Sequence, residues 1–174
     1  MLEAVYCHQM GGSLWDDRSR SENTTPEVAA AIDGSSLVVE RFGSWLKFED
    51  AEIVSIAFDR GNLTQIVRTG RWKEAVHPSL EAVFYVFDAS RASGSPDRKP
   101  SLLTMRFSRL DRFALNGFNH QNPIVGLAII RERSDRLKTD LFAVDWGGTA
   151  MFHEASFTCE KIEVVKLECL PAEI

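Results

Sequence analysis

Apolar and polar residues alternate in short stretches along most of this 174-residue chain. Alternation with a period of two is typical of a β-strand that buries one of its faces. The pattern is clearest in 103–107, where Leu103, Met105 and Phe107 are separated by polar residues. Similar stretches predict further strands at 51–59, 63–68, 80–88, 109–118, 124–132, 141–146, 150–158 and 161–169. About nine short strands joined by turns leave little room for crossover helices, so we expect antiparallel sheet.

The segment 80–88 differs from the others because both of its faces are apolar. Leu80 and Phe84 lie on one predicted face, and Val83 and Tyr85 lie on the other. A strand of this kind is buried on both sides, so we place it at the centre of a sheet. The whole pattern predicts a mainly β fold, α+β at most: an antiparallel β-sandwich or a strongly curved sheet with one or two short helices.

Residues 1–34 are less regular, and we interpret them as an irregular N-terminal arm that precedes a single domain at 35–174. Within the arm, Thr25 is a suitable N-cap for a short helix that begins at Pro26 and ends at Gly34. The next segment, 36–42, predicts a strand or a short helix, because periodicity does not separate the two over so few residues.

Composition and charge narrow the class of protein. Hydrophobic residues make up 44% and charged residues 26%, which is ordinary for a folded soluble domain. The 20 Lys and Arg against 25 Asp and Glu give a net charge of −5, which disfavours a nucleic-acid binder and suits a basic partner. An apolar run of about eighteen residues is missing, so we expect no membrane span. Three cysteines without close pairing and the lack of a secretory signal favour a reducing, cytoplasmic location.

The stretch 42–59 combines core residues with an acidic patch. Its predicted core residues are Trp45, Phe48, Val54, Ile56 and Phe58. Glu49, Asp50 and Glu52 form the patch, and carboxylates this close resist burial unless a cation or a donor offsets their charge. Asp50 and Glu52 are two residues apart, so on a strand they point to the same face. Such a pair can serve a glycosidase-like hydrolase, but more often it forms a solvated or partner-binding surface.

Motifs for metal binding or catalysis are missing from the sequence. The four histidines are scattered, and a metal site would require Cys7 and His8 to converge with His153 and Cys159. A GxSxG elbow and a glycine-rich phosphate loop are also missing. We therefore expect no metal, no cofactor and no enzymatic activity.

Two further features have both a structural and a functional interpretation. The polar run Asn119–Asn122 includes His120 and Gln121 and most often closes a turn by bonding the nearby backbone; alternatively it adds to a contact surface beside the acidic strand. Most tryptophans are expected in the core, whereas an exposed one would suit an interface.

Three segments together resemble the immunity protein 50 family of bacterial polymorphic toxin systems. They are FGSWLKFEDAEIVSIAFDR at 42–60, LLTMRFSRL at 102–110 and LNGFNHQNPIVGLAI at 115–129. The resemblance covers about 36–169. The chain departs from the family pattern at Glu49, where a His is expected, and it matches at Asp50, Ala51, Glu52, Phe118, Asn119, Gln121 and Asn122.

The resemblance implies a non-enzymatic protein that binds and neutralises a cognate toxin domain. The acidic charge favours a toxin domain with a basic surface, because complementary charge raises the rate of association. The predicted toxin-binding residues are Glu49, Asp50, Glu52, His120 and Gln121. Two alternatives remain: a β-sandwich module that binds a ligand such as a carbohydrate, and a hydrolase that uses the carboxylates.

Overall fold

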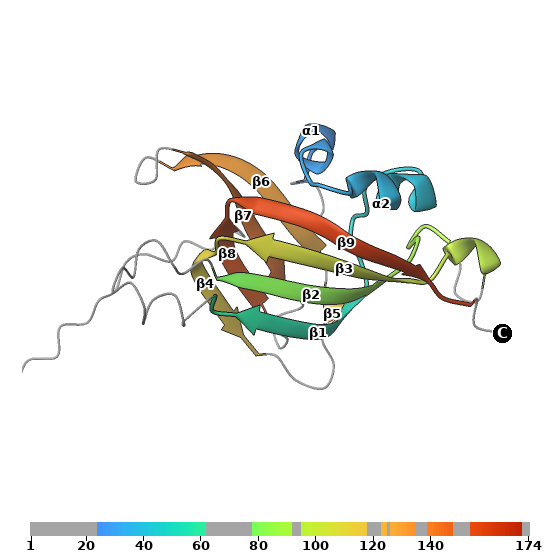
Figure 1. Ribbon diagram of the computed structural model, residues 1–174. Helices are drawn as coiled ribbons and strands as arrows, with labels where there is room; N and C mark the ends of the chain where they lie inside the picture. Colours follow the sequence, from blue (N-terminus) through green and yellow to red (C-terminus); the bar gives the residue numbers. More distant parts are fainter. Residues whose placement is uncertain are drawn as a thin grey trace, which may run out of the picture.

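In the part of the chain that the structure describes, two layers of antiparallel β-sheet have two short α-helices beside them (Figure 1). The fold was analysed in a computed structural model. It describes residues 24–61, 78–91, 95–117, 123–124, 126–134, 139–147 and 154–171. Within these residues the mainly β class predicted from the sequence is confirmed.

The first sheet has five strands in the order β5-β1-β2-β3-β9. Their bounds are Pro123–Ile124 for β5, Ala51–Asp59 for β1, Ser79–Val86 for β2, Ser101–Ser108 for β3 and Lys161–Cys169 for β9. β2 lies between β1 and β3, as predicted, but its outer face with Val83 and Tyr85 is half-buried and not buried as expected. Leu80, Ala82, Phe84 and Val86 of β2 are all buried.

The second sheet has four strands in the order β4-β8-β7-β6. Their bounds are Asp111–Asn116 for β4, Glu154–Cys159 for β8, Thr139–Gly147 for β7 and Gly126–Ser134 for β6. An edge-to-face aromatic cluster fills the space between the layers, with ring centroids 5.0–5.7 Å apart. Its members are Phe48, Phe84, Phe107, Trp146 and Phe157.

The chain passes from one sheet to the other at sharp corners. β3 leads to β4 through Arg109, which has a left-handed φ of 58°, and β8 leads to β9 through the single residue Glu160. The two corners are joined, because the Glu160 N–H donates to the Ser108 carbonyl (3.1 Å) and Arg109 pairs with the Glu160 carboxylate (3.2 Å). The sequence pattern predicted one continuous strand from 109, but the left-handed turn delays β4 until Asp111.

Helices α1 (Pro26–Ala30) and α2 (Ser35–Phe42) lie beside the edge formed by β9 and β6 (Figure 1). Thr25 caps α1 as predicted, its hydroxyl accepting from the Val28 N–H (3.4 Å). The ambiguous segment after the arm is a helix. Thr24 ties the start of α1 to the sandwich, because its hydroxyl accepts from the Ile129 N–H (2.9 Å).

The elbow between the two helices is fastened to β9. The Asp33 N–H donates to the Ile162 carbonyl (3.1 Å), and the Val164 N–H donates to the Asp33 carbonyl (2.7 Å). Gly34 has a φ of 74°, and a Cβ atom there would lie 2.6 Å from the Val164 carbonyl oxygen. Only glycine fits this elbow without displacing the strand.

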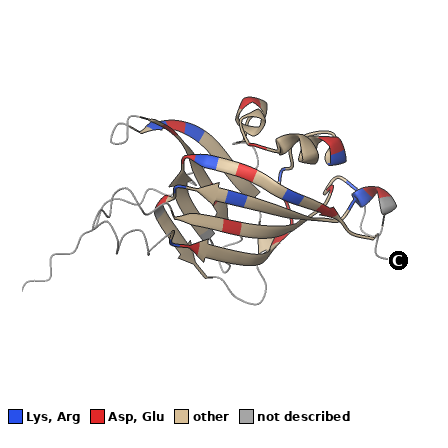
Figure 2. Ribbon diagram, in the orientation of Figure 1, with Lys and Arg blue, Asp and Glu red and all other residues tan. Residues whose placement is uncertain are grey.

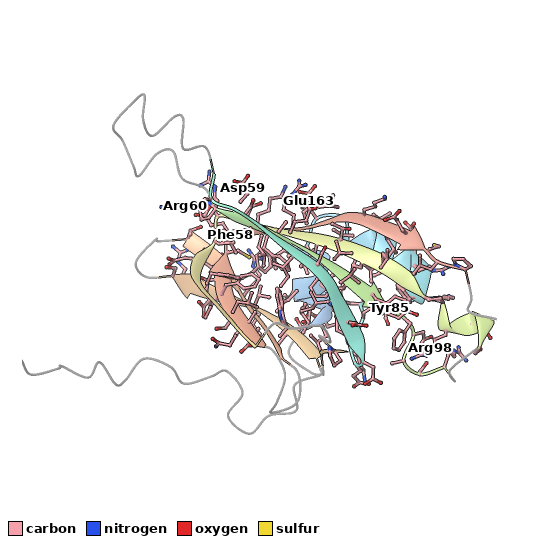
Figure 3. All side chains as sticks on the ribbon, turned by 90° about the horizontal axis from the view of Figure 1, so that it is seen from below. Phe58, Asp59, Arg60, Tyr85, Arg98 and Glu163 are labelled. Atoms are coloured by element: carbon pink, nitrogen blue, oxygen red, sulfur yellow. The ribbon has the colours of Figure 1, made fainter. Side chains whose placement is uncertain are left out.

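Two predicted core residues of 42–60, Val54 and Phe58, are 55% and 52% exposed. Val54 is the extra residue of a β-bulge in β1, because the pairing with β2 shifts by one residue between Ile53 and Ser55. A one-residue insertion reverses which alternate residues face inward, so Phe58 pairs with the buried Leu80 and stacks on Phe113 (5.6 Å). Phe58 remains exposed at the end of β1. Figure 3 shows Phe58 at the end of the sheet opposite to Tyr85 and Arg98. The predicted strand 63–68 lies outside the described residues.

Candidate functional site

Residues 43–52, which we call the acidic turn, connect α2 to β1 through unusual backbone conformations. Gly43 ends α2 with a φ of 86°, and its N–H donates to the Val39 carbonyl (2.7 Å). Phe48 and Asp50 follow with left-handed φ values of 59° and 58°. A bulky L-residue rarely adopts this conformation, so packing around the turn must stabilise it.

Phe48 supplies that packing. Its side chain is 3% exposed and lies edge-on to Phe84, with ring centroids 5.6 Å apart. Trp45 packs against its other side at 6.1 Å, and the Ala51 N–H donates to the Phe48 carbonyl (3.2 Å). Ala51 and Ile53 are also buried, so the acidic turn stands on a base that belongs to the core.

The three carboxylates of the acidic turn point away from this base. Glu49, Asp50 and Glu52 are exposed, whereas their neighbours Phe48 and Ala51 are buried. No Lys or Arg in the described part of the chain lies within ion-pair distance of them. Their negative charge therefore faces solvent without compensation from the described residues.

The outer face of the five-stranded sheet offers a contrast. Acidic and basic residues alternate along β9 (Figure 2), and charged side chains of this sheet pair with one another. Arg106 pairs with Glu81 (2.8 Å) across β3 and β2, and Lys166 pairs with Glu168 (2.7 Å) on β9. Lys161 pairs with Asp33 (2.9 Å), and that hydrogen bond raises the pKa of Lys161. The carboxylates of the acidic turn, unlike those of this face, form no ion pair with a described Lys or Arg.

The same-face arrangement expected for Asp50 and Glu52 assumed that both residues lie on one strand, and that assumption is wrong. β1 begins at Ala51, and Asp50 precedes it in the left-handed conformation. The two-residue alternation of a strand therefore does not apply between these two carboxylates.

A hollow of about 300 Å³ lies beside the acidic turn, between the end of α2 and the chain after β2. Its lining includes Trp45 and Glu49 on one side and Phe87, Asp88 and Ser90 on the other. The Ser90 hydroxyl donates to the Asp88 carboxylate (2.6 Å) and lowers the pKa of Asp88. The Trp45 indole N–H is buried and has no hydrogen-bond acceptor among the described residues.

Side-chain contacts hold the far wall of this hollow. The guanidinium of Arg98, from the 3₁₀ turn Pro96–Arg98, lies 3.6 Å from the centre of the Phe87 ring. Lys99 donates from Nζ to the carbonyl of Arg41 at the end of α2 (2.8 Å). The loop after β2 is therefore tied to the helix that leads into the acidic turn.

The remaining predicted site residues, His120 and Gln121, lie outside the described residues. The strand that follows their loop is described, however, and it lies beside the acidic turn. Pro123 pairs with Glu52, and Ile124 pairs with Ala51. The structure thus brings the chain just after the polar run to the edge of β1, as the functional interpretation of that run requires.

The structure describes two of the four tryptophans. Trp146 is 0% exposed in the centre of the sandwich, and Trp45 is half-buried and lines the hollow. Trp15 and Trp72 lie outside the described residues. Sequence reasoning did not find Phe87, Asp88 and Ser90, because their part in the hollow depends on the fold bringing two distant segments together.

Metal-binding chemistry finds no support in the described residues. No group of three or more His, Cys, Asp or Glu side chains gathers there, and the four histidines all fall outside them. Cys159 is buried, and burial raises the pKa of its thiol to about 12. The helices that the structure describes are all too short to cross a membrane.

Comparisons with protein-family models, with curated proteins and with solved structures found no match to this chain. Any function assigned to the chain must therefore be argued from its own residues, and the acidic turn and the hollows beside it are the features that carry such an argument.

Proposed function

We propose that this protein is a non-enzymatic immunity protein that binds a cognate toxin domain through the acidic turn. The observation that carries the proposal is the exposure of Glu49, Asp50 and Glu52 on a base fixed by Phe48 and Ala51. A preformed contact surface loses little conformational entropy when a partner binds. The resemblance of 42–60, 102–110 and 115–129 to the immunity protein 50 family supplies the class of partner.

Charge supports a toxin domain with a basic surface. The net charge of the chain is −5, and the three carboxylates of the acidic turn form no ion pair with a described Lys or Arg. Complementary charge speeds association and discriminates against acidic partners. Left-handed backbone at a surface segment also fits a binding role, because strain of this kind gathers at functional sites.

The direct test is a growth rescue in bacteria that express the toxin domain encoded beside this protein. The wild-type chain should restore growth. The variant with Glu49→Gln, Asp50→Asn and Glu52→Gln should restore it poorly, because it removes the charge and keeps side-chain size. Asn is chosen at 50 because it tolerates the left-handed conformation better than most residues.

A matched control changes three exposed acidic residues elsewhere: Glu40→Gln, Asp97→Asn and Glu132→Gln. Both triple variants change the net charge equally, so a general charge effect would weaken both. Full rescue by the acidic-turn variant would place the contact surface elsewhere. Failure of the wild-type chain to rescue or to bind the toxin domain would refute the immunity function.

One observation favours a carbohydrate-binding module as the second candidate. Trp45 forms part of the wall of the hollow of about 300 Å³, together with the polar side chains of Glu49, Asp88 and Ser90. An aromatic ring beside a few convergent polar groups is the usual composition of a small-ligand site. Saturable binding of a soluble oligosaccharide, lost in Trp45→Ala but kept in Asp50→Asn/Glu52→Gln, would support this function over the first, because Asp50 and Glu52 do not line the hollow.

A further inference from the structure

A groove separate from the smaller hollow lies between α1, α2, Leu127 and residues 44–47, and we call it the helical groove. Its volume is about 740 Å³. Small-molecule sites in proteins usually measure roughly 300–1,000 Å³. The groove is therefore large enough for an organic ligand.

The lining of this helical groove is chiefly apolar. Pro26, Ala29, Val39 and Leu127 contribute carbon surface, and Trp45 contributes to both this groove and the smaller hollow. The hydroxyls are those of small Ser and Thr residues. Val39 remains 43% exposed, so part of this apolar surface meets solvent in the described part of the chain. An apolar ligand would remove it from water, which is favourable.

Charge in the helical groove has one sign. Among the described residues, Lys47 is the only charged one in the lining, and no carboxylate lines the groove. The Lys47 ammonium group attracts an anionic group and repels a cationic one. The groove thus combines apolar surface with one cation that favours a negatively charged ligand group.

We propose that the helical groove binds an amphipathic organic anion, with an apolar chain or ring along α1 and α2 and a carboxylate or similar group near Lys47. Glu49, Asp50 and Glu52, the carboxylates proposed for toxin binding, do not line the helical groove, although residues 44–47 of the acidic turn do. A cationic ligand is disfavoured by Lys47. A strongly polar ligand such as a sugar is disfavoured by the apolar walls.

The test uses the full chain and two probes of equal length, decanoate and decan-1-ol. Titration followed by the backbone and indole N–H signals in NMR should show saturable binding of decanoate. The shifted signals should lie in 24–47 and at Leu127, with the Trp45 indole signal identified by its loss in Trp45→Phe. Decan-1-ol should bind about threefold to tenfold more weakly, because it cannot pair with a cation.

Two exposed residues of α2 provide a matched pair of variants. Leu37 and Val39 are 42% and 43% exposed, and only Val39 lines the groove. Val39→Ser should weaken binding of both probes about fivefold, because it removes apolar contact. Leu37→Ser should leave both affinities unchanged. Lys47→Gln should weaken decanoate about threefold and leave decan-1-ol unchanged.

Each contrary outcome overturns a defined part of the proposal. Equal affinity for the two probes would overturn the preference for an anion. Equal losses in Leu37→Ser and Val39→Ser would show that binding does not occur in the helical groove. The lack of saturable binding by decanoate would overturn the site altogether, and it would leave the toxin-binding proposal untouched.

Discussion

Phe48 joins the candidate site to the core. Its left-handed φ of 59° costs roughly 1–2 kcal/mol for an L-residue, and its burial against Phe84 offsets that cost. The positions of Glu49 and Asp50 at the surface depend on this balance of strain and burial, because they are held there only while Phe48 is buried in the core. A single buried ring thus determines the direction in which two carboxylates point.

A pair of substitutions separates burial from backbone strain in the acidic turn. Phe48→Ala should lower the free energy of unfolding by about 3–5 kcal/mol, since it removes a buried aromatic ring. Asp50→Gly should leave it unchanged or raise it by up to about 1 kcal/mol, because glycine adopts positive φ at little cost. Urea unfolding measures both, and equal destabilisation by the two would contradict this division of roles.

Burial of Cys159 makes the free energy of unfolding depend on pH. Burial raises the pKa of its thiol to about 12, whereas a thiol in the unfolded chain titrates near about 8.5. Between these values the unfolded chain binds fewer protons than the folded one, so the free energy of unfolding falls as pH rises. That loss is complete only near pH 12, and the stabilising contribution is fully present below about pH 8.5.

Between about pH 8.5 and 10 the wild-type chain should lose about 1–2 kcal/mol more stability than Cys159→Ala, as measured by urea unfolding at each pH. The exposed thiol of Cys169 should react with a thiol reagent in the folded state at pH 8, and Cys159 should react only after unfolding. Both labelling measurements use a chain with Cys7→Ser. If the free energy of unfolding fell equally with pH in the wild type and in Cys159→Ala, the raised pKa of Cys159 would be contradicted.

Sequence reasoning favoured a solvated or partner-binding role for the carboxylates but missed the backbone that presents them. Like charges at Glu49, Asp50 and Glu52 resist burial wherever the chain takes them, so their exposure follows from local chemistry. The left-handed conformations of Phe48 and Asp50 have no local signal such as glycine. They arise because Phe84, which is distant in the sequence, receives the Phe48 ring.

At the scale of elements, the elbow between α1 and α2 determines where the helical groove forms. Asp33 and Gly34 fasten the elbow to β9 through two backbone hydrogen bonds and a close approach to Val164. The helices would otherwise be held mainly by Ala29, Ile32 and Val38, which are buried against the sandwich.

Two glycines make a controlled test of this attachment. Gly34→Ala should destabilise the protein by about 2–4 kcal/mol, because it adds a backbone clash with Val164 to the cost of positive φ. Gly43→Ala meets no atom within 4 Å and should cost only about 1 kcal/mol. Hydrogen exchange in Gly34→Ala should accelerate in α1 and α2. Similar effects of the two substitutions would argue against the close approach as the cause.

Element boundaries were predictable where local signals exist. Thr25 and Pro26 predicted the start of α1, and alternation predicted β1 and β9 with the bounds that the structure gives them. The bulge at Val54 was not predictable, since one extra residue in a strand leaves no mark in the sequence. The segment before the acidic turn became a helix because α2 packs its buried Val38 against the sandwich, a tertiary effect that periodicity over eight residues cannot reveal.

For the whole molecule, the fold class followed from the number and spacing of the strands. The corners between the two sheets did not follow from the sequence. Arg109 turns the chain at one corner with a left-handed φ, and at the other corner the Glu160 N–H donates to the Ser108 carbonyl. These corners let β3 continue into β4 and β8 continue into β9, so both sheets share one aromatic core. The acidic turn stands at one end of this framework, beside β5.

The central claim is that the acidic turn is the surface that binds a toxin domain. Its most direct measurement is a calorimetric titration of the toxin domain encoded beside this protein, at about 50 and about 300 mM salt. The chains compared are the wild type, the variant Glu49→Gln/Asp50→Asn/Glu52→Gln and the control Glu40→Gln/Asp97→Asn/Glu132→Gln. We predict that neutralising the acidic turn weakens binding about tenfold or more and reduces its salt dependence, while the control binds as the wild type does. Equal affinity of the neutralised variant and the wild type would contradict the claim.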